Sequence, residues 1–101
     1  MPEFATPFAG MASDRKLTMQ ELVRAIRYVI AAEYEAIQLY TQLAESTDDE
    51  RARAVLIDIA DEEVVHAGEF LRLLKELEPR EEELYKEGYE EVEEILEKLR
   101  K

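Results

Sequence analysis

The sequence predicts an all-α fold in which two long helices form an antiparallel hairpin and a short C-terminal helix follows. Ala, Glu, Leu, Lys and Arg make up 57 of the 101 residues, a composition typical of long helices. Gly and Pro number only three each, too few for the many tight turns of an all-β fold. Apolar residues recur at steps of three and four over two long segments, as on one face of a helix. These observations favour a helical hairpin over residues 18–78.

A capping box marks the start of the first helix. Thr18 and Glu21 fit the Ser/Thr-x-x-Glu pattern, in which each side chain accepts a hydrogen bond from the backbone N–H of the other. The apolar face that follows runs to about Glu45. Residues 1–17 hold two prolines and a glycine without a helical period, so we expect a flexible N-terminal lead-in.

The second helix is expected from about Asp49 to Glu78, with an N-cap supplied by the connection before it. Pro79 ends this helix or opens the next one. Residues 79–101 indicate an acidic C-terminal helical tail, with a break expected at Gly88. The seam of the second helix alternates steps of four and three, a pattern that packs against other helices, over Ala52, Leu56, Ile59, Glu63, His66, Phe70, Leu73 and Leu77.

The length of the connection determines how the two helices pair. A link of three or four residues forces them to lie antiparallel. A hairpin of this kind cannot cover its own apolar faces. We therefore expect it to pair with a second copy by two-fold symmetry, as a homodimer that forms a four-helix bundle.

Charge and composition exclude several classes of function. The 25 acidic residues outnumber the 13 basic ones, and the net charge of −12 would repel nucleic-acid phosphates. No apolar run is long enough to span a membrane, and the N-terminus lacks the pattern of a secretory signal, so a cytoplasmic protein is expected. The chain holds no Cys, which excludes disulfides, iron–sulfur clusters and thiol nucleophiles.

Three ionisable residues interrupt the apolar stripes. Glu33 lies on the first helix, while Glu63 and His66 form a Glu-x-x-His pair on the second. Residues three apart on a helix point the same way. Folding the hairpin at positions 47–48 places Glu33 level with positions 62–63, so we expect the three side chains to converge on one point.

This set amounts to half of a di-iron carboxylate site. A complete site takes one Glu from each of two helices and a Glu-x-x-His pair from each of two others. Two copies related by a two-fold axis would supply four Glu and two His, which suits two iron ions. The alternative is that the same residues form a buried polar network that fixes helix register, or hold a structural metal such as zinc or calcium.

Three short sequence runs around these residues together match the pattern of a known protein family: Glu33-Tyr34-Glu35-Ala36-Ile37-Gln38-Leu39-Tyr40, Ser46-Thr47-Asp48 and Asp61-Glu62-Glu63-Val64-Val65-His66-Ala67. They resemble the encapsulated ferritins, which are half-length members of the ferritin-like superfamily. The resemblance implies a ferritin-like four-helix bundle formed by two chains around a shared di-iron ferroxidase centre, with two Fe per dimer. It also implies that dimers assemble into a larger ring, often a decamer, carried as cargo inside an encapsulin shell.

The resemblance also implies roles for individual residues. The three side chains that interrupt the stripes correspond to the iron ligands, and Tyr40 corresponds to a tyrosine beside the centre. Glu35 matches one acid of the site at which metal enters, whose other acid falls at Ala32 here. Glu62 is interpreted either as an acid that supports the ligands or as a solvated surface residue.

The predicted function is that of a ferroxidase, which oxidises Fe(II) to Fe(III) for iron storage or detoxification within an encapsulin nanocompartment in the cytoplasm. A rubrerythrin-like peroxidase is an alternative, although such proteins usually add a Cys-ligated iron module and this chain holds no Cys. The other alternative is a non-enzymatic helical assembly module with a structural metal or a buried polar network.

Overall fold

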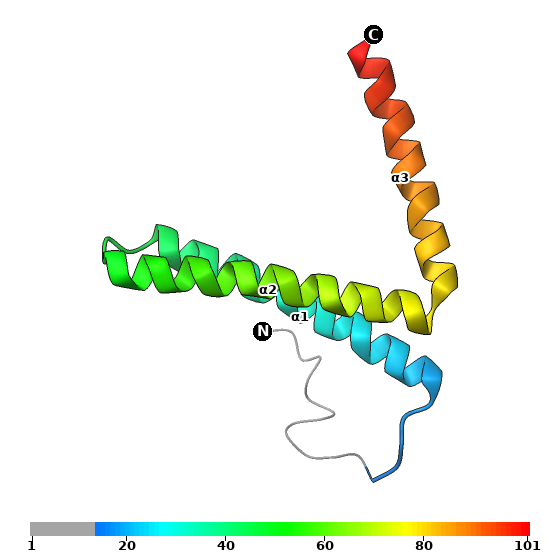
Figure 1. Ribbon diagram of the computed structural model, residues 1–101, viewed down its shortest axis with the longest axis horizontal. Helices are drawn as coiled ribbons and strands as arrows, with labels where there is room; N and C mark the ends of the chain where they lie inside the picture. Colours follow the sequence, from blue (N-terminus) through cyan, green and yellow to red (C-terminus); the bar gives the residue numbers. More distant parts are fainter. Residues whose placement is uncertain (1–13) are drawn as a thin grey trace.

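The structure, a computed structural model, describes residues 14–101 and consists of three α-helices over that range. Helix α1 spans Met19–Glu45, α2 spans Glu50–Leu77 and α3 spans Pro79–Arg100. In Figure 1, α1 and α2 lie side by side and α3 projects from one end of the pair. The predicted all-α class and hairpin are confirmed, while residues 1–13 of the predicted lead-in lie outside the described residues.

Helix α1 begins with the predicted capping box. The Glu21 backbone N–H donates to the Thr18 hydroxyl at 3.1 Å, and the Thr18 N–H donates to the Glu21 carboxylate at 2.9 Å. Arg15 donates two further hydrogen bonds to the same carboxylate, at 2.8 and 2.7 Å. The Arg15 hydrogen bonds, followed by that from Thr18, lower the pKa of Glu21 to about 2, so this cap is charged at neutral pH.

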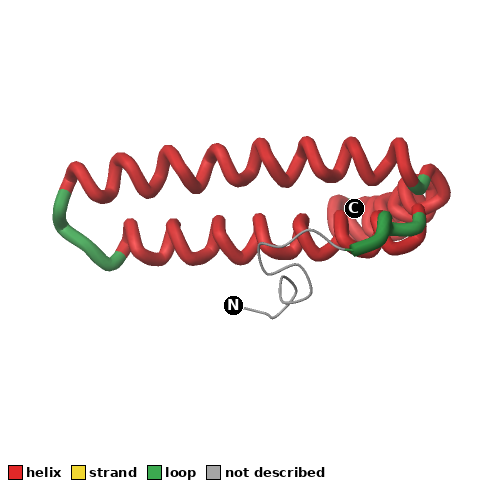
Figure 2. The backbone as a smooth tube through the Cα atoms, turned by 90° about the horizontal axis from the view of Figure 1, so that it is seen from below, coloured by secondary structure: helices red, strands yellow, loops and turns green. Residues whose placement is uncertain are grey.

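Four residues between α1 and α2 reverse the chain. The Ser46 backbone N–H donates to the Leu43 carbonyl at 3.0 Å and closes the last turn of α1. One carboxylate oxygen of Asp49 accepts hydrogen bonds from the N–H groups of Arg51 and Ala52, at 2.9 and 3.0 Å, and caps α2. The two helices therefore run antiparallel, as Figure 2 shows.

A cluster of large apolar side chains holds the hairpin together toward its open end. It consists of buried Val23, Ile26, Ile30 and Leu74, with partly buried Leu22, Phe70 and Leu77 packed against them. The other buried residues between positions 14 and 101 are Ala44, Ala60 and Ala67. An alanine buries little apolar area, so each of these three contributes less packing energy than a residue of the cluster.

Most of the seam predicted on α2 is half-buried, and its residues Phe70 and Leu77 pack against the core cluster. The buried positions are Ala60, Ala67 and Leu74, whereas His66 and Leu73 of the predicted seam are exposed. The apolar face of α2 is wide, and a single neighbouring helix covers only one strip of it. The strip that carries His66 and Leu73 is left open on this chain, and we call it the open strip.

Helix α3 leaves the hairpin at a steep angle (Figure 1). Pro79 is its first residue, and only Glu78, with φ −141° and ψ 76°, separates it from α2. The helix continues through Gly88, so the break predicted there is wrong. A glycine inside a helix costs only about 1 kcal/mol relative to alanine, and the Glu- and Leu-rich sequence around it favours a helix.

A cluster of Arg27, Glu81 and Tyr85, here called the α3 clamp, attaches α3 to α1. Arg27 Nε donates to Glu81 Oε1 at 3.0 Å, and the Tyr85 hydroxyl donates to the other oxygen of the same carboxylate. The hydrogen bond from Arg27 lowers the pKa of Glu81. Burial, together with the nearby Glu81 carboxylate, raises the pKa of Tyr85 to about 12.

The described chain leaves much apolar surface uncovered. Its radius of gyration is 17.7 Å, against about 13 Å for a compact domain of this length. Helix α3 has no buried residue, and its exposed large apolar side chains are Leu84, Tyr85, Tyr89, Val92, Ile95 and Leu99. None of the helices in the described range is long and apolar enough to cross a membrane.

Candidate metal centre

The middle of the hairpin brings one acid of α1 beside an acid and a histidine of α2. Glu33 lies on α1, and Glu63 and His66 lie one turn apart on α2. Each of these side chains offers one ligand atom, and the three atoms all lie within 4.8 Å of one another. The convergence expected from the spacing is therefore present in the structure.

The separations within this group suit an ion better than direct contact. His66 Nδ1 lies 3.6 Å from Glu63 Oε2 and 3.9 Å from Glu33 Oε2. Both distances are too long for a hydrogen bond. Two metal–ligand bonds of about 2.0–2.2 Å, the length that zinc makes to nitrogen and oxygen, would span separations of this size. The three residues thus fit a first-row metal ion between them.

One carboxylate oxygen of Glu33 is held away from water without a hydrogen-bond partner. Its Oε2 is inaccessible to solvent and accepts no hydrogen bond. The side chains of Glu33 and Glu63 are only 17% and 19% exposed. Leaving a buried acceptor unpaired costs about 1–3 kcal/mol. A cation bound at this oxygen would remove the penalty.

The donor set consists of two carboxylates and one imidazole, a combination that iron and other divalent first-row metals accept. Three donors do not complete the coordination of such an ion. The side chain of His66 is 49% exposed and belongs to the open strip, so the group is open to solvent on the side of His66. Further donors would have to approach from that side.

The other residues singled out in the sequence lie outside this group. Tyr40 is half-buried on α1, two turns from Glu33 and on the same face of the helix. Glu35 is half-buried on α1, and Glu62 is exposed on α2. The group close enough to share an ion, within the described residues, includes neither of these two acids. The roles expected for Tyr40, Glu35 and Glu62 stay predictions.

A hollow of about 380 Å³ opens beside the candidate centre. Its lining consists of Glu33, His66, Glu69, Phe70 and Leu73. Glu69 is a residue that the sequence interpretation missed. Its position three residues after His66 places both side chains on one side of α2 and could have identified it. Because the sequence contains 20 glutamates, this spacing alone did not distinguish Glu69 from the others.

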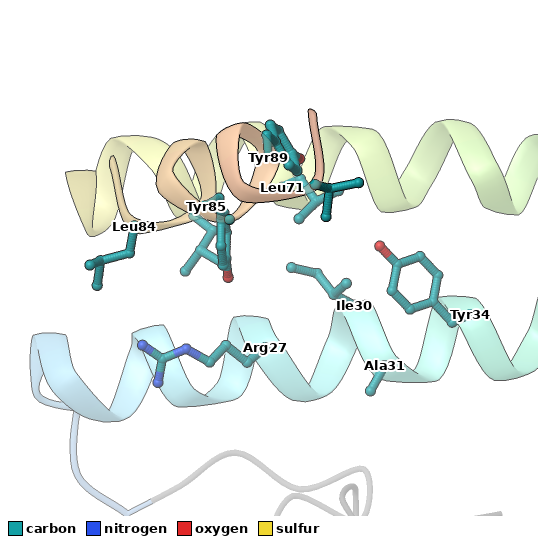
Figure 3. Close-up of a pocket in the computed structure, with 11 residues that line it drawn as sticks. Arg27, Ile30, Ala31, Tyr34, Leu71, Leu84, Tyr85 and Tyr89 are labelled. Carbon is teal, nitrogen blue, oxygen red and sulfur yellow. The ribbon is translucent and has the colours of Figure 1, made fainter. Parts of the chain in front are cut away.

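A larger groove of about 740 Å³ lies between the hairpin and α3 (Figure 3). Ile30 and Tyr34 of α1 line one side of it, and Tyr85 and Tyr89 of α3 line the other. Its walls are mainly apolar, and no residue of the candidate centre contributes to them. The groove is therefore separate from the metal-ligating group.

Comparisons with known proteins identify relatives over most of the chain. The family model for rubrerythrin matches residues 24–101, a range that includes all three candidate ligands. The ferritin-like-encapsulin shell fusion protein of Pyrococcus furiosus is 44% identical over 82 residues, which are 81% of this chain and 24% of that protein. The encapsulin nanocompartment cargo protein EncC of Myxococcus xanthus is 41% identical over 90 residues, which are 89% of this chain and 68% of that protein.

The chain therefore spans about a quarter of the length of the Pyrococcus fusion protein and about two thirds of that of the Myxococcus protein. A solved structure agrees in fold as well as in sequence. The crystal structure of the encapsulated ferritin domain from Pyrococcus furiosus matches with a TM-score of 0.80 and 42% identity. The match covers 84% of this chain and 87% of that one.

Proposed function

Because this chain belongs to the rubrerythrin family of ferritin-like proteins, in the branch of the encapsulated ferritins, we propose that it is a ferroxidase that oxidises Fe²⁺ to Fe³⁺. The observation that carries the proposal is the group formed by Glu33, Glu63 and His66, with its orphaned carboxylate oxygen. A buried carboxylate oxygen without a hydrogen-bond partner is costly, and a metal-binding role gives a reason for that cost.

The active site in this proposal is shared by two chains. Each chain brings two carboxylates and one imidazole, and a two-fold axis through the open strip doubles this set to four Glu and two His. That is the ligand set of di-iron carboxylate bundles. The exposure of His66 and Leu73 on the open strip supports the pairing, since a second copy would cover both.

In this site the two Fe²⁺ ions are the substrate. Four carboxylates balance the charge of two Fe²⁺ ions and stabilise the more highly charged Fe³⁺ product. Each Fe²⁺ gives up one electron. Dioxygen takes up two electrons and two protons and leaves as hydrogen peroxide, or peroxide takes up two electrons and two protons and leaves as two waters. His66 provides the neutral nitrogen donor, which requires its imidazole to be unprotonated.

The compartment in which the product accumulates is proposed from the relatives. The names of the Myxococcus and Pyrococcus proteins describe a nanocompartment cargo and a fusion to an encapsulin shell. We propose that this chain likewise acts inside an encapsulin shell, as a homodimer that assembles further into a ring. Co-expression with an encapsulin shell protein, followed by sedimentation of the shells, tests whether the chain travels with them.

Oxidation of Fe²⁺ tests the catalytic proposal. Fe²⁺ is added anaerobically to metal-free protein, air is admitted, and the formation of Fe³⁺ is followed for wild type and for His66→Ala. We expect fast oxidation by wild type and loss of the protein-dependent rate in His66→Ala, with the helical circular dichroism retained. Equal rates for wild type and the protein-free control would refute the ferroxidase activity.

Asp61→Asn serves as the matched control, because Asp61 is an exposed acid on α2 outside the ligand group. This variant is expected to oxidise iron at the wild-type rate. Repeating the assay with hydrogen peroxide in place of air separates the two oxidants. Turnover with peroxide alone would favour the rubrerythrin-like peroxidase.

A further inference from the structure

Helix α3 carries a stripe of large apolar side chains that the described chain leaves uncovered. The stripe, here called the α3 stripe, consists of Tyr85, Tyr89, Val92, Ile95 and Leu99, all of them exposed. Its first three residues line the groove of about 740 Å³ between α3 and the hairpin. Its last two lie on the part of α3 that projects away from the hairpin in Figure 1. A continuous exposed apolar surface of this kind marks an interaction site.

The spacing of the α3 stripe is symmetric about Val92. The steps between its residues are four, three, three and four, so they are the same in both directions along the helix. A second α3 that lies antiparallel, with a two-fold axis at Val92, brings Leu99 opposite Tyr85 of the partner subunit and Ile95 opposite Tyr89 of the partner subunit. An interface with two-fold symmetry needs a patch that is complementary to itself. The α3 stripe meets this requirement.

The charges at the two ends of α3 favour the antiparallel direction. The first turns carry Glu82 and Glu83, and the last turn carries Lys98 and Arg100. In an antiparallel pair, the basic end of each helix lies beside the acidic start of the other, and opposite charges attract. A parallel pair would place like charges side by side.

Gly88 provides room for a second helix to approach α3. It lies within α3 and lines the groove, and a methyl group at this position would meet no atom within 4 Å beyond its own helix backbone. The single chain therefore gives no steric reason for a glycine where an alanine would favour the helix. In the antiparallel pair, Leu96 lies opposite Gly88 of the partner subunit. A residue without a side chain permits close approach there.

We propose that α3 pairs with α3 of a second copy, antiparallel about Val92, so that the projecting half of each helix covers the groove of the other chain. None of Glu33, His66 and Leu73 lines this groove, so the contact is separate from the open strip. A chain with two separate two-fold interfaces joins dimers to dimers. The inference deepens the proposed function, on which the size of the assembly rests, by naming the contact that joins one metal-binding dimer to the next.

Cross-linking through one introduced cysteine tests the register of the pair. The chain has no Cys, so Val92→Cys carries a single thiol, at the position of the two-fold axis. A short bis-maleimide should convert this variant to covalent dimers on a denaturing gel. Glu90→Cys places the thiol at an exposed position two residues away, on the opposite side of α3, and should stay monomeric. Equal cross-linking of the two variants, or none in Val92→Cys, would overturn the antiparallel pairing.

Native mass spectrometry of iron-loaded Val92→Glu separates this inference from the metal site. Val92 is exposed in the single chain, so the helical circular dichroism should be retained. We expect wild type to form assemblies larger than a dimer, and Val92→Glu to form dimers that keep one iron per chain. Glu90→Lys changes the charge on the opposite side of α3 and should keep the wild-type assembly size.

The outcomes distinguish the two proposals. Val92→Glu assemblies of wild-type size would overturn the pairing of α3, and so would wild type that stops at an iron-loaded dimer, while both results leave the metal site standing. Iron-free wild type whose assemblies still become smaller in Val92→Glu would refute the metal site and support the pairing of α3.

Discussion

At the scale of single residues, the placement of Glu33 carries an energetic cost. Its side chain is largely buried on the helix pair, and one oxygen has neither solvent nor a donor. Capping carboxylates such as Asp49 and Glu21 accept hydrogen bonds instead. An unpaired carboxylate oxygen in the middle of a hairpin weakens the metal-free fold, and in the proposed metal site a bound cation would offset this cost.

Glu33→Leu is therefore expected to stabilise the metal-free protein. The change removes the penalty of an unpaired buried acceptor, about 1–3 kcal/mol, and adds apolar contact at the same place. The variant should melt at a higher temperature than wild type in the presence of EDTA, and should lose the increase in Tm that Co²⁺ gives to wild type. Thermal unfolding followed by circular dichroism at a fixed protein concentration measures both effects.

Glu62→Leu makes the same substitution at an exposed neighbour of the site and provides the comparison. It removes no buried charge, so its effect on the Tm without metal should be small. A Glu33→Leu protein that is less stable than wild type in EDTA would mean that the carboxylate supports the fold by itself.

The sequence predicted the meeting of Glu33 with Glu63 and His66 because a helix rises by a fixed amount per residue on both sides of a short turn. Residues at equal distances from the turn must then lie level. It did not predict the orphaned Glu33 oxygen or the hollow next to Glu69. Both depend on side-chain conformations and on local surface shape, which periodicity does not describe.

At the scale of the helices, the ends were predictable because they carry local signals. Thr18, Asp49 and Pro79 each act through hydrogen bonds or backbone geometry within a few residues of themselves. The exact strip of α2 that faces α1 was not predictable, because the apolar face of α2 is wide enough to pack against two neighbouring helices. The break at Gly88 was predicted wrongly because one glycine is weaker than the helix-forming sequence around it.

The α3 clamp gives the attachment of α3 a dependence on pH. The pKa of Glu81 is lowered in the folded chain, first by the hydrogen bond from Arg27, so its ionised form stabilises the fold. That contribution is complete above the ordinary carboxyl pKa of 4.5 and is lost as the pH falls through the lower folded value. The Tm of wild type should therefore fall as the pH drops below 4.5. The Tm of Glu81→Gln should lack this part of the decrease, because glutamine does not titrate.

The comparison is a series of melting curves from neutral pH down to pH of about 3, across the range in which carboxylates titrate. Glu83→Gln, an exposed acid in the same turn region, should keep the wild-type pH dependence. Parallel curves for wild type and Glu81→Gln across the whole range would show that the clamp does not contribute to stability.

At the scale of the whole molecule, the described chain is extended and leaves apolar residues on the open strip and along α3. Composition and helix length predicted that the hairpin could not cover its own faces. The direction of α3 could not be predicted, because it depends on the backbone angles of one residue, Glu78, and on the long-range contact between Arg27 and Glu81. In the proposed homodimer, a second copy on the open strip covers His66 and completes the metal site.

Native mass spectrometry of protein loaded anaerobically with Fe²⁺ tests this central claim most directly, because it counts chains and irons in the same particle. Assemblies should contain an even number of chains and one iron per chain, and Glu63→Gln should remove the iron. Asp61→Asn should give the same masses as wild type apart from the substitution. Iron bound to single chains with the wild-type stoichiometry, or even-numbered assemblies that carry no iron, would contradict a di-iron site shared between two copies.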